Sequence, residues 1–313
     1  MMLDIKKVKT YPLLKRKNKV NTKNFSRLYI KQSGINGLRM SLPRILAAKD
    51  LMDIVADIVS AHKRKKPVIF MMGAHVIKCG LNPIIIDLLK RNIISTIALS
   101  GAGLIHDFET ALIGSTSEDV ASALEDGSFG MADETARYIN AAIKEGAKRN
   151  MGMGKSIGNF IIARKKQFPF KELSILYNAS VKKIPVTIHV GIGTDIIHQH
   201  PSCDGASLGK TSLADFHLLA NIISGLEGGV VINWGSAVIL PEVFLKALNI
   251  ARNLGHRVRK FTAVDFDMIR HYRPTQNVIA RPTTLGGRGY AITGHHEIML
   301  PLLAAFLIEE LGT

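Results

Sequence analysis

Cysteine is scarce in this 313-residue chain, which contains two cysteines and one tryptophan. The cysteines, Cys79 and Cys203, lie far apart and show no spacing typical of a metal site. A disulfide scaffold is therefore excluded, and a reducing cytoplasm is the simplest expectation for where the protein works.

Long apolar runs are also missing. The longest, residues 298–308, falls short of the ~18 to 20 residues that a membrane span needs, and Pro301 interrupts it. The basic residues at the N-terminus are not followed by the apolar segment of a signal peptide. We therefore expect a cytoplasmic protein with no membrane partner.

Acidic residues are few relative to basic ones, because 25 Asp and Glu accompany 41 Lys and Arg, and the formal net charge is +16. About half of this excess lies in residues 1–30, where Asp4 is the only acidic residue. We treat residues 1–45 as a basic N-terminal extension. No recognition helix or aromatic-interleaved RNA motif accompanies the charge, so nucleic acid is not an expected partner.

The rest of the chain has the composition of a globular protein, 47% hydrophobic and 21% charged. Short apolar runs, rich in β-branched residues, alternate with helical patterns, and each run leads to glycine. The runs are residues 67–70, 95–99, 184–190 and 230–233. This alternation predicts an α/β fold with a doubly wound, mostly parallel, Rossmann-like sheet, in a single domain over residues 46–313. The polar stretch 146–171 and the glycine-rich segment 286–297 are predicted to be loops, and residues 259–264 are predicted to form a short strand.

Glycines at the carboxyl ends of parallel strands converge on one crevice, where helix N-termini bind phosphates. The standard nucleotide motifs do not fit, however. Both Gly-Lys-Ser/Thr segments, 154–156 and 209–211, lack the earlier glycine of a P-loop, and His106 replaces the third glycine of the dinucleotide fingerprint. A variant phosphate turn at residues 100–106 stays open.

Histidines are abundant near the predicted strand ends, where a neutral imidazole suits acid–base chemistry. They are His75, His106, His189, His295 and His296. Three further side chains, Asp195, His198 and His200, have a spacing that suits a metal ion if the segment is a strand. Hydrogen bonding to an organic substrate is the favoured alternative, so no metal is expected.

From about Pro67 to its C-terminus, the chain resembles the deoxyhypusine synthase family. Residues 100–107, SGAGLIHD, look like the family's Thr-Thr-Ala-Gly-Gly-Val-Glu-Glu, and residues 156–159, SIGN, look like its Arg-Ile-Gly-Asn. Ile184-Pro-Val with Thr194-Asp195 is similar to its Ile-Pro-Val and Thr-Asp-Gly, and Pro301-Leu-Leu matches its Pro-Leu-Leu.

The resemblance implies an NAD-binding fold, and a homo-oligomer, with a tetramer favoured, whose active sites lie between subunits. Members of the family oxidise spermidine with NAD and pass an aminobutyl group, through an imine on an enzyme lysine, to a protein lysine. By position, and from the strand-end glycines, the predicted NAD contacts are Gly73, His75, Ser100, Gly101, Gly103, Asp195 and Gly235.

The family's catalytic residues do not carry over. Its two polyamine-binding glutamates correspond to His106 and Asp107, and its catalytic histidine falls among residues 239–241, Ile-Leu-Pro. Its imine-forming lysine falls near Arg288 and Tyr290, neither of which forms an imine. Lys78 is a weak candidate for an acceptor lysine elsewhere.

We therefore predict an NAD-dependent enzyme similar to deoxyhypusine synthase but with a different reaction, which oxidises, or transfers an alkyl or aminoalkyl group of, a small polar substrate such as an amine. His106, His295 or His296 would transfer the proton, Asp107 would orient a polar or cationic group, and Arg288 would bind an anionic one. The alternatives are a metal-dependent hydrolase that uses Asp195, and a non-catalytic nucleotide- or RNA-binding protein that uses the basic extension.

Overall fold

The computed structural model describes residues 3–312, in which six strands form one parallel sheet with the order β3-β2-β1-β4-β5-β6. This order confirms the doubly wound, Rossmann-like fold, because β1 pairs with β2 on one side and with β4 on the other. The strands are β1 (Val68–Met72), β2 (Thr96–Ser100), β3 (Val186–His189), β4 (Val230–Trp234), β5 (Thr262–Asp267) and β6 (Arg288–Thr293).

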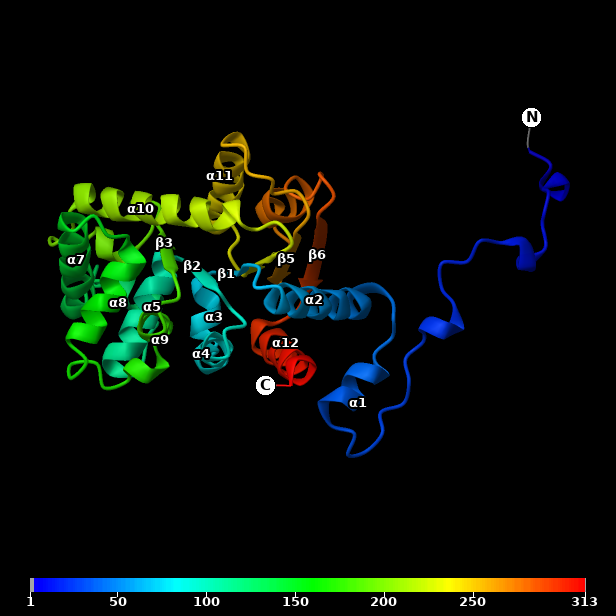
Figure 1. The fold of residues 1–313 in the computed structure, drawn as a ribbon, viewed down its shortest axis with the longest axis horizontal. Helices are drawn as coiled ribbons and strands as arrows, with labels where there is room; N and C mark the ends of the chain where they lie inside the picture. The colour runs from blue at the N-terminus through cyan, green and yellow to red at the C-terminus, as the bar shows by residue number, and fades with distance from the viewer. Residues whose placement is uncertain (1–2, 313) are drawn as a thin grey trace.

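Helices connect the strands and cover both faces of the sheet (Figure 1). Two further turns matter below: η5 (Ile196–His198) is a 3-10 turn after β3, and η6 (Pro274–Ala280) is a π-helical segment before β6. The helices are α1 (Gly34–Ser41), α2 (Leu46–Lys63), α3 (Ala74–Lys78), α4 (Asn82–Lys90), α5 (Gly101–Ile113), α6 (Val120–Glu125), α7 (Asp133–Lys148), α8 (Met153–Ala163), α9 (Ile175–Val181), α10 (Gly205–Ser224), α11 (Ile239–Asn253) and α12 (His296–Leu311).

Strands β1 to β5 are buried on both faces, so their alternate side chains enter two separate hydrophobic cores. From β1, Phe70 and Met72 enter the larger core, which α2, α5 and α12 help to form, while Ile69 and Met71 enter the smaller one. The smaller core lies beneath α10, α11 and η6, which Figure 1 shows on one side of the sheet.

Local signals set the helix ends near the sheet. The side chain of Ser100 caps α5 by accepting a hydrogen bond from the Gly103 amide, and Gly114 ends this helix in a left-handed conformation. Pro83 lies in the first turn of α4, where a missing amide hydrogen costs nothing. These signals are readable in the sequence, and they explain why the helical patterns were recognisable.

The N-terminal segment follows a different course. Residues 3–33 contain only single-turn 3-10 helices and are almost entirely exposed, and Figure 1 shows them leading away from the sheet. The chain first meets the body at α1, where Asn36 donates to Glu309 and Arg39 pairs with Glu310 on α12. The division at residue 45 stays a prediction.

Two predicted loops are wrong. Residues 146–171 include α8, whose Met153, Ile157 and Ile161 enter the larger core. The glycine-rich segment 286–297 forms β6 and the start of α12. The sequence concealed β6 because this edge strand is largely exposed and lacks a continuous apolar run.

No helix within residues 3–312 is both long enough and apolar enough to cross a membrane.

Replacing Gly154 with alanine tests the contact of α8 with β3. A Cβ atom there would lie 2.0 Å from the carbonyl oxygen of Val186, so we expect the free energy of unfolding to fall by about 1–3 kcal/mol. Gly209→Ala is the matched control, since nothing lies within 4 Å of that position on α10 and the helix should gain ~0.5–1 kcal/mol. Urea denaturation measures both, and equal effects would contradict the close contact.

Candidate functional site

The carboxyl ends of β1 and β4, where this fold is expected to form its ligand crevice, are each followed by a glycine. A Cβ atom on Gly73 would lie 2.5 Å from the carbonyl oxygen of Gly235. Gly235 itself has a φ of +62°, and a Cβ atom there would lie 2.5 Å from Nε2 of His296. Both positions therefore require glycine because the chain packs closely on itself at the point where the strand order reverses.

Buried polar side chains surround this crevice. His296 is 1% exposed, and its ring lies 5.7 Å from that of His75 and 6.1 Å from that of Trp234. Nδ1 of His296, Nε1 of Trp234 and Oδ2 of Asp267 are buried and have no hydrogen-bond partner among the described residues. Unpaired buried donors and acceptors are costly, so this cluster fits a polar ligand that completes them.

The charge state of His296 suits a hydrogen-bonding role. Burial lowers the pKa of its imidazole, and the nearby Asp267 carboxylate partly opposes that shift. The ring is therefore neutral near pH 7, with one nitrogen that donates and one that accepts. His295 is exposed and lies 3.7 Å from the Glu297 carboxylate, at the outer rim of the crevice.

A second cluster lies at the start of α5, where Asp195 approaches Gly101 from the connection after β3. A Cβ atom on Gly101 would lie 2.0 Å from Oδ2 of Asp195, so the glycine makes room for the carboxylate. Burial raises the pKa of Asp195 to about 6, although hydrogen bonds from Thr194 and the Ala102 amide oppose the rise. Oδ2 accepts no hydrogen bond within residues 3–312, although Nε2 of His198 lies 3.9 Å away. A carboxylate thus takes the place that a phosphate often takes at a helix N-terminus.

The predicted metal alternative is wrong. Asp195 and His198 belong to η5 and its cap rather than to a strand, and Nδ1 of His198 accepts from the amides of Gly193 and Asp195. His200 instead faces Ser202 and Asp133. Within residues 3–312, no three His, Cys, Asp or Glu side chains come together as metal ligands.

His106 lies on the second turn of α5 and belongs to a hydrogen-bonded chain. The hydroxyl of Thr116 donates to Glu109, so its oxygen accepts from Nδ1 of His106, at 2.7 Å. Burial, with a smaller contribution from Lys78 on α3, lowers the pKa of His106. The imidazole is therefore neutral and protonated at Nδ1, which leaves the lone pair of Nε2 free to accept a proton.

Asp107 does not orient a substrate, contrary to the sequence prediction. It is fully buried, and it accepts from the Ser174 hydroxyl at 2.6 Å and from the amides of Ile175 and Leu176 at 2.7 and 3.1 Å. Asn82 donates to it as well. The carboxylate thus fastens the start of α9 to α5, even though burial raises its pKa to about 6.

Arg288 is also displaced from the predicted site. It begins β6 and pairs with Thr262 at the amino end of β5, and its guanidinium forms an ion pair with Asp57. β6 then runs about 16 Å before it reaches the carboxyl edge near His295. The predicted loop is a strand, and therefore Arg288 and the two histidines lie at opposite edges of the sheet.

Sequence reasoning missed Asp267 and Thr116, and it considered Glu109 as a ligand contact rather than as a partner of Thr116. The signal for Asp267 was present, because a carboxylate that ends a buried strand needs a reason to be there. The predicted strand stopped at residue 264, whereas β5 continues to Asp267. The Thr116 and Glu109 contacts depend on how the loop after α5 folds back, which no sequence pattern signals.

No protein-family model and no curated protein matches the sequence. Solved structures do share its fold. A conserved protein of the LOR/SDH group from Methanococcus maripaludis S2 is 17% identical, with a TM-score of 0.53, over 85% of this chain and 70% of that one. AgrE, solved in complex with ornithine and NAD+, is 12% identical, with a TM-score of 0.53, over 84% of this chain.

This chain spans 33% of the length of AgrE. A protein from Entamoeba histolytica described as a deoxyhypusine synthase is 9% identical, with a TM-score of 0.49, which is too low to carry an argument. The likenesses therefore show a Rossmann-like fold that is shared with NAD-related enzymes. The resemblance to deoxyhypusine synthases rests on the sequence motifs alone.

Replacing Asp107 with alanine separates its structural role from a role in substrate binding. The change leaves the amides of Ile175 and Leu176 without an acceptor, so we expect the free energy of unfolding to fall by about 3 kcal/mol. Asp126→Ala, at an exposed turn, should leave the free energy of unfolding nearly unchanged. A fully stable Asp107→Ala protein in thermal denaturation would return this carboxylate to the list of substrate contacts.

Proposed function

We propose that the protein is an NAD-dependent enzyme whose dinucleotide lies across the carboxyl ends of the strands around β1 and β4. The supporting observation is a pair of buried carboxylates, each with one oxygen that accepts no hydrogen bond within residues 3–312 and has only a histidine nitrogen 3.9 Å away. Asp195 follows β3 and Asp267 ends β5, so they lie on opposite sides of the point where the strand order reverses. Carboxylates at such positions bind ribose hydroxyls, and a dinucleotide contains two riboses.

The phosphate groups require other donors than those at the start of α5, because Asp195 already accepts from the Ala102 amide. The amides at the start of α11, which follows Gly235 closely, are the proposed alternative. His75 and His296 would donate to or accept from the ligand beside Gly73. The predicted contacts Ser100 and Gly103 then act indirectly, since they cap α5 and position its first turn.

When bound, NAD supplies a hydride acceptor or donor, and the chain must provide a base for the accompanying proton. We assign this base to His106, whose free Nε2 lies on the helix that packs against α3. Lys78 lies close enough to lower the pKa of His106, and Asp107 is committed to α9. Residues 106 and 107 therefore offer no free carboxylate that could hold a polyamine. A neutral or anionic polar substrate is favoured over a cationic amine.

The reaction class is also part of this proposal. A deoxyhypusine synthase-like enzyme that oxidises, or transfers an alkyl group of, its substrate agrees with the sequence motifs and with the changed residues at 106 and 107. A homo-oligomer, with a tetramer favoured, also stays a proposal. It is supported by exposed apolar side chains next to the strand ends: Ile192, Ile269, Tyr272 and Ile298.

Calorimetric titration with NAD tests the cofactor site. We expect micromolar binding that weakens at least tenfold in Asp195→Ala, because a ribose hydroxyl loses its acceptor. Asp204→Ala, on the same connection but capping α10, should bind as the unchanged protein does. A ribose hydroxyl favours the ionised carboxylate, so affinity should fall as the pH drops below about 6, the pKa of Asp195.

Absence of NAD binding by protein that circular dichroism shows to be folded would contradict the proposal. Binding that is equally strong in Asp195→Ala and Asp204→Ala would contradict the place given to the ribose. NADP and free adenosine nucleotides belong in the same series, because a preference for one of them would change the cofactor while the crevice stayed correct.

The state of His106 can be measured without substrate. Nitrogen-15 NMR should show a neutral ring protonated at Nδ1, with a pKa below the ordinary value of a histidine. Thr116→Val removes the acceptor for that proton, so the Nδ1 tautomer should lose its dominance while the fold is retained. Thr110→Val, where the hydroxyl bonds only to the His106 carbonyl, is the control. An unchanged tautomer in Thr116→Val would contradict the hydrogen-bonded chain.

A further inference from the structure

Basic side chains concentrate at the amino edge of the sheet, opposite the crevice. Every helix-to-strand connection reaches the sheet at this edge, and together these connections carry ten basic residues and one acidic residue, Glu227. The basic residues are Arg64, Lys65, Lys66, Arg91, Lys182, Lys183, Arg257, Arg259, Lys260 and Arg281. We call these ten residues the cationic edge.

The opposite edge has no such excess. The strand-to-helix connections, which surround the crevice, carry two basic residues, Arg270 and Arg273, and two acidic residues, Asp195 and Asp204. The two edges belong to one sheet and differ by nine in net charge, so the overall composition of the chain does not account for the cationic edge.

Helix dipoles explain only part of this charge. Arg64, Arg91, Lys182 and Arg281 directly follow helices, where a cation stabilises the C-terminus. The other six lie beyond the last helical turn, where that effect fades. Within residues 3–312, Arg91 alone among the ten forms an ion pair, with Asp87. The remaining nine form no ion pair within that range, although Glu227 lies near Arg257 and Lys260. Arg64 and Lys182 donate to backbone carbonyls instead.

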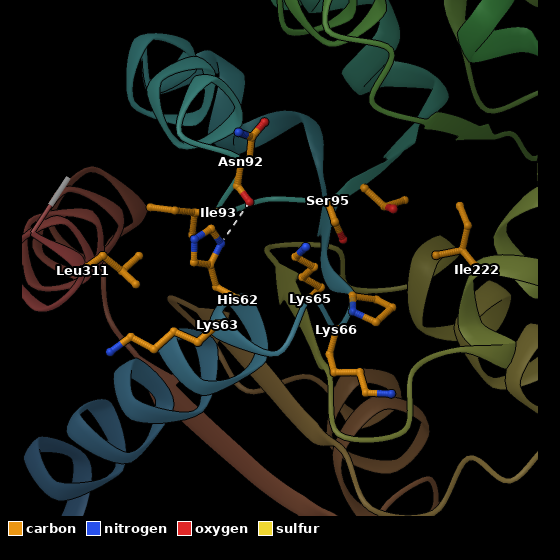
Figure 2. A pocket seen from close by; sticks show the side chains of 11 residues that line it. His62, Lys63, Lys65, Lys66, Asn92, Ile93, Ser95, Ile222 and Leu311 are labelled. Atoms are coloured by element: carbon orange, nitrogen blue, oxygen red, sulfur yellow. Dashed lines mark hydrogen bonds between the residues drawn. The ribbon is translucent and has the colours of Figure 1, made fainter.

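A groove runs into this edge beside β1 and β2. Its volume is about 790 Å³, and Lys63, Lys65 and Lys66 line it together with Asn92 and Ser95 from the next connection. Figure 2 shows the three lysine side chains spread around this groove, with His62 hydrogen-bonded to the carbonyl of Asn92. Ile93, Ile222 and Leu311 also line the groove, so the lysine side chains border a hollow that is partly apolar.

The cationic edge forms a row, because the connections follow one another along the sheet. Six strands at a spacing of ~4.8 Å extend over about 24 Å. A row of cations suits a linear polyanion better than a broad membrane surface or a compact acidic protein. We propose that the amino edge of the sheet binds the phosphate backbone of nucleic acid, independently of base sequence.

The residues at this edge account for that lack of sequence preference. Among Phe, Tyr and Trp, the six connections contain only Phe261, which is 3% exposed, and His256 is their one exposed ring, so stacking on bases would contribute little. The contacts would therefore be electrostatic and sensitive to salt. Sequence reasoning expected no nucleic acid partner because no recognition helix or aromatic-interleaved RNA motif accompanies the basic residues. The cationic edge as a whole is assembled from connections far apart in the chain.

Fluorescence anisotropy with a labelled 30-base-pair DNA duplex and a single-stranded RNA of equal length tests this inference. The edge variant combines Lys65→Gln, Lys66→Gln and Lys260→Gln, and the matched control combines Lys15→Gln, Lys17→Gln and Lys19→Gln in the extension. All six side chains are exposed. We expect at least tenfold weaker binding at 100 mM salt for the edge variant only, with its slope of log affinity against log salt reduced by roughly two to three.

Three results would overturn the inference: no binding of either nucleic acid at 50 mM salt, equal losses in both variants, or a loss confined to the control. Vesicles that contain phosphatidylserine provide a further arm, and tighter binding to them than to both nucleic acids would assign the edge to a membrane surface instead. The inference is independent of NAD binding, which both variants should retain.

Discussion

The parallel pairing of β1 with β4 is the constraint on which the rest of this structure depends. Because consecutive strands β1 and β2 lie side by side while β4 returns to the other side of β1, the chain must leave neighbouring strands in opposite directions. At the point where the strand order reverses, Gly73 and Gly235 come into close backbone contact. This strand order also draws His296, from the last helix, against residues that are separated from it by more than half of the chain.

Two buried carboxylates have similarly raised pKa values but different roles. Burial raises the pKa of both Asp107 and Asp195 to about 6, so the shift alone does not distinguish them. Their hydrogen bonds do. The oxygens of Asp107 are shared among donors that begin α9, whereas Oδ2 of Asp195 has none within residues 3–312. An incomplete set of partners is the better guide to a ligand site than a perturbed pKa.

Sequence patterns predicted the sheet because buried parallel strands are continuous apolar runs, and those of β1, β2, β3 and β4 are hard to misread. They failed at β6, where an exposed edge strand carries glycine and arginine, and this one error moved Arg288 to the wrong end of the sheet. At the site, the strand-end glycines were recognisable from their positions.

Other features were not recognisable in the sequence. The turn that separates His198 from His200 and the fold-back that brings Thr116 to His106 depend on tertiary packing. So does the assembly of the cationic edge from six separate connections. In each case, tertiary packing decides which residues come into contact, and no local periodicity in the sequence indicates those contacts.

The unequal charge of the two sets of connections makes the charge distribution asymmetric along the strands. In the field of any extended polyanion, this asymmetry would rotate the protein in solution before contact, so that the amino edge approaches first. The crevice would then face away, open to bulk solvent. The sheet would thereby bind the polyanion at its amino edge and small molecules at its carboxyl edge. Small molecules could enter and leave the carboxyl edge while the polyanion stays bound.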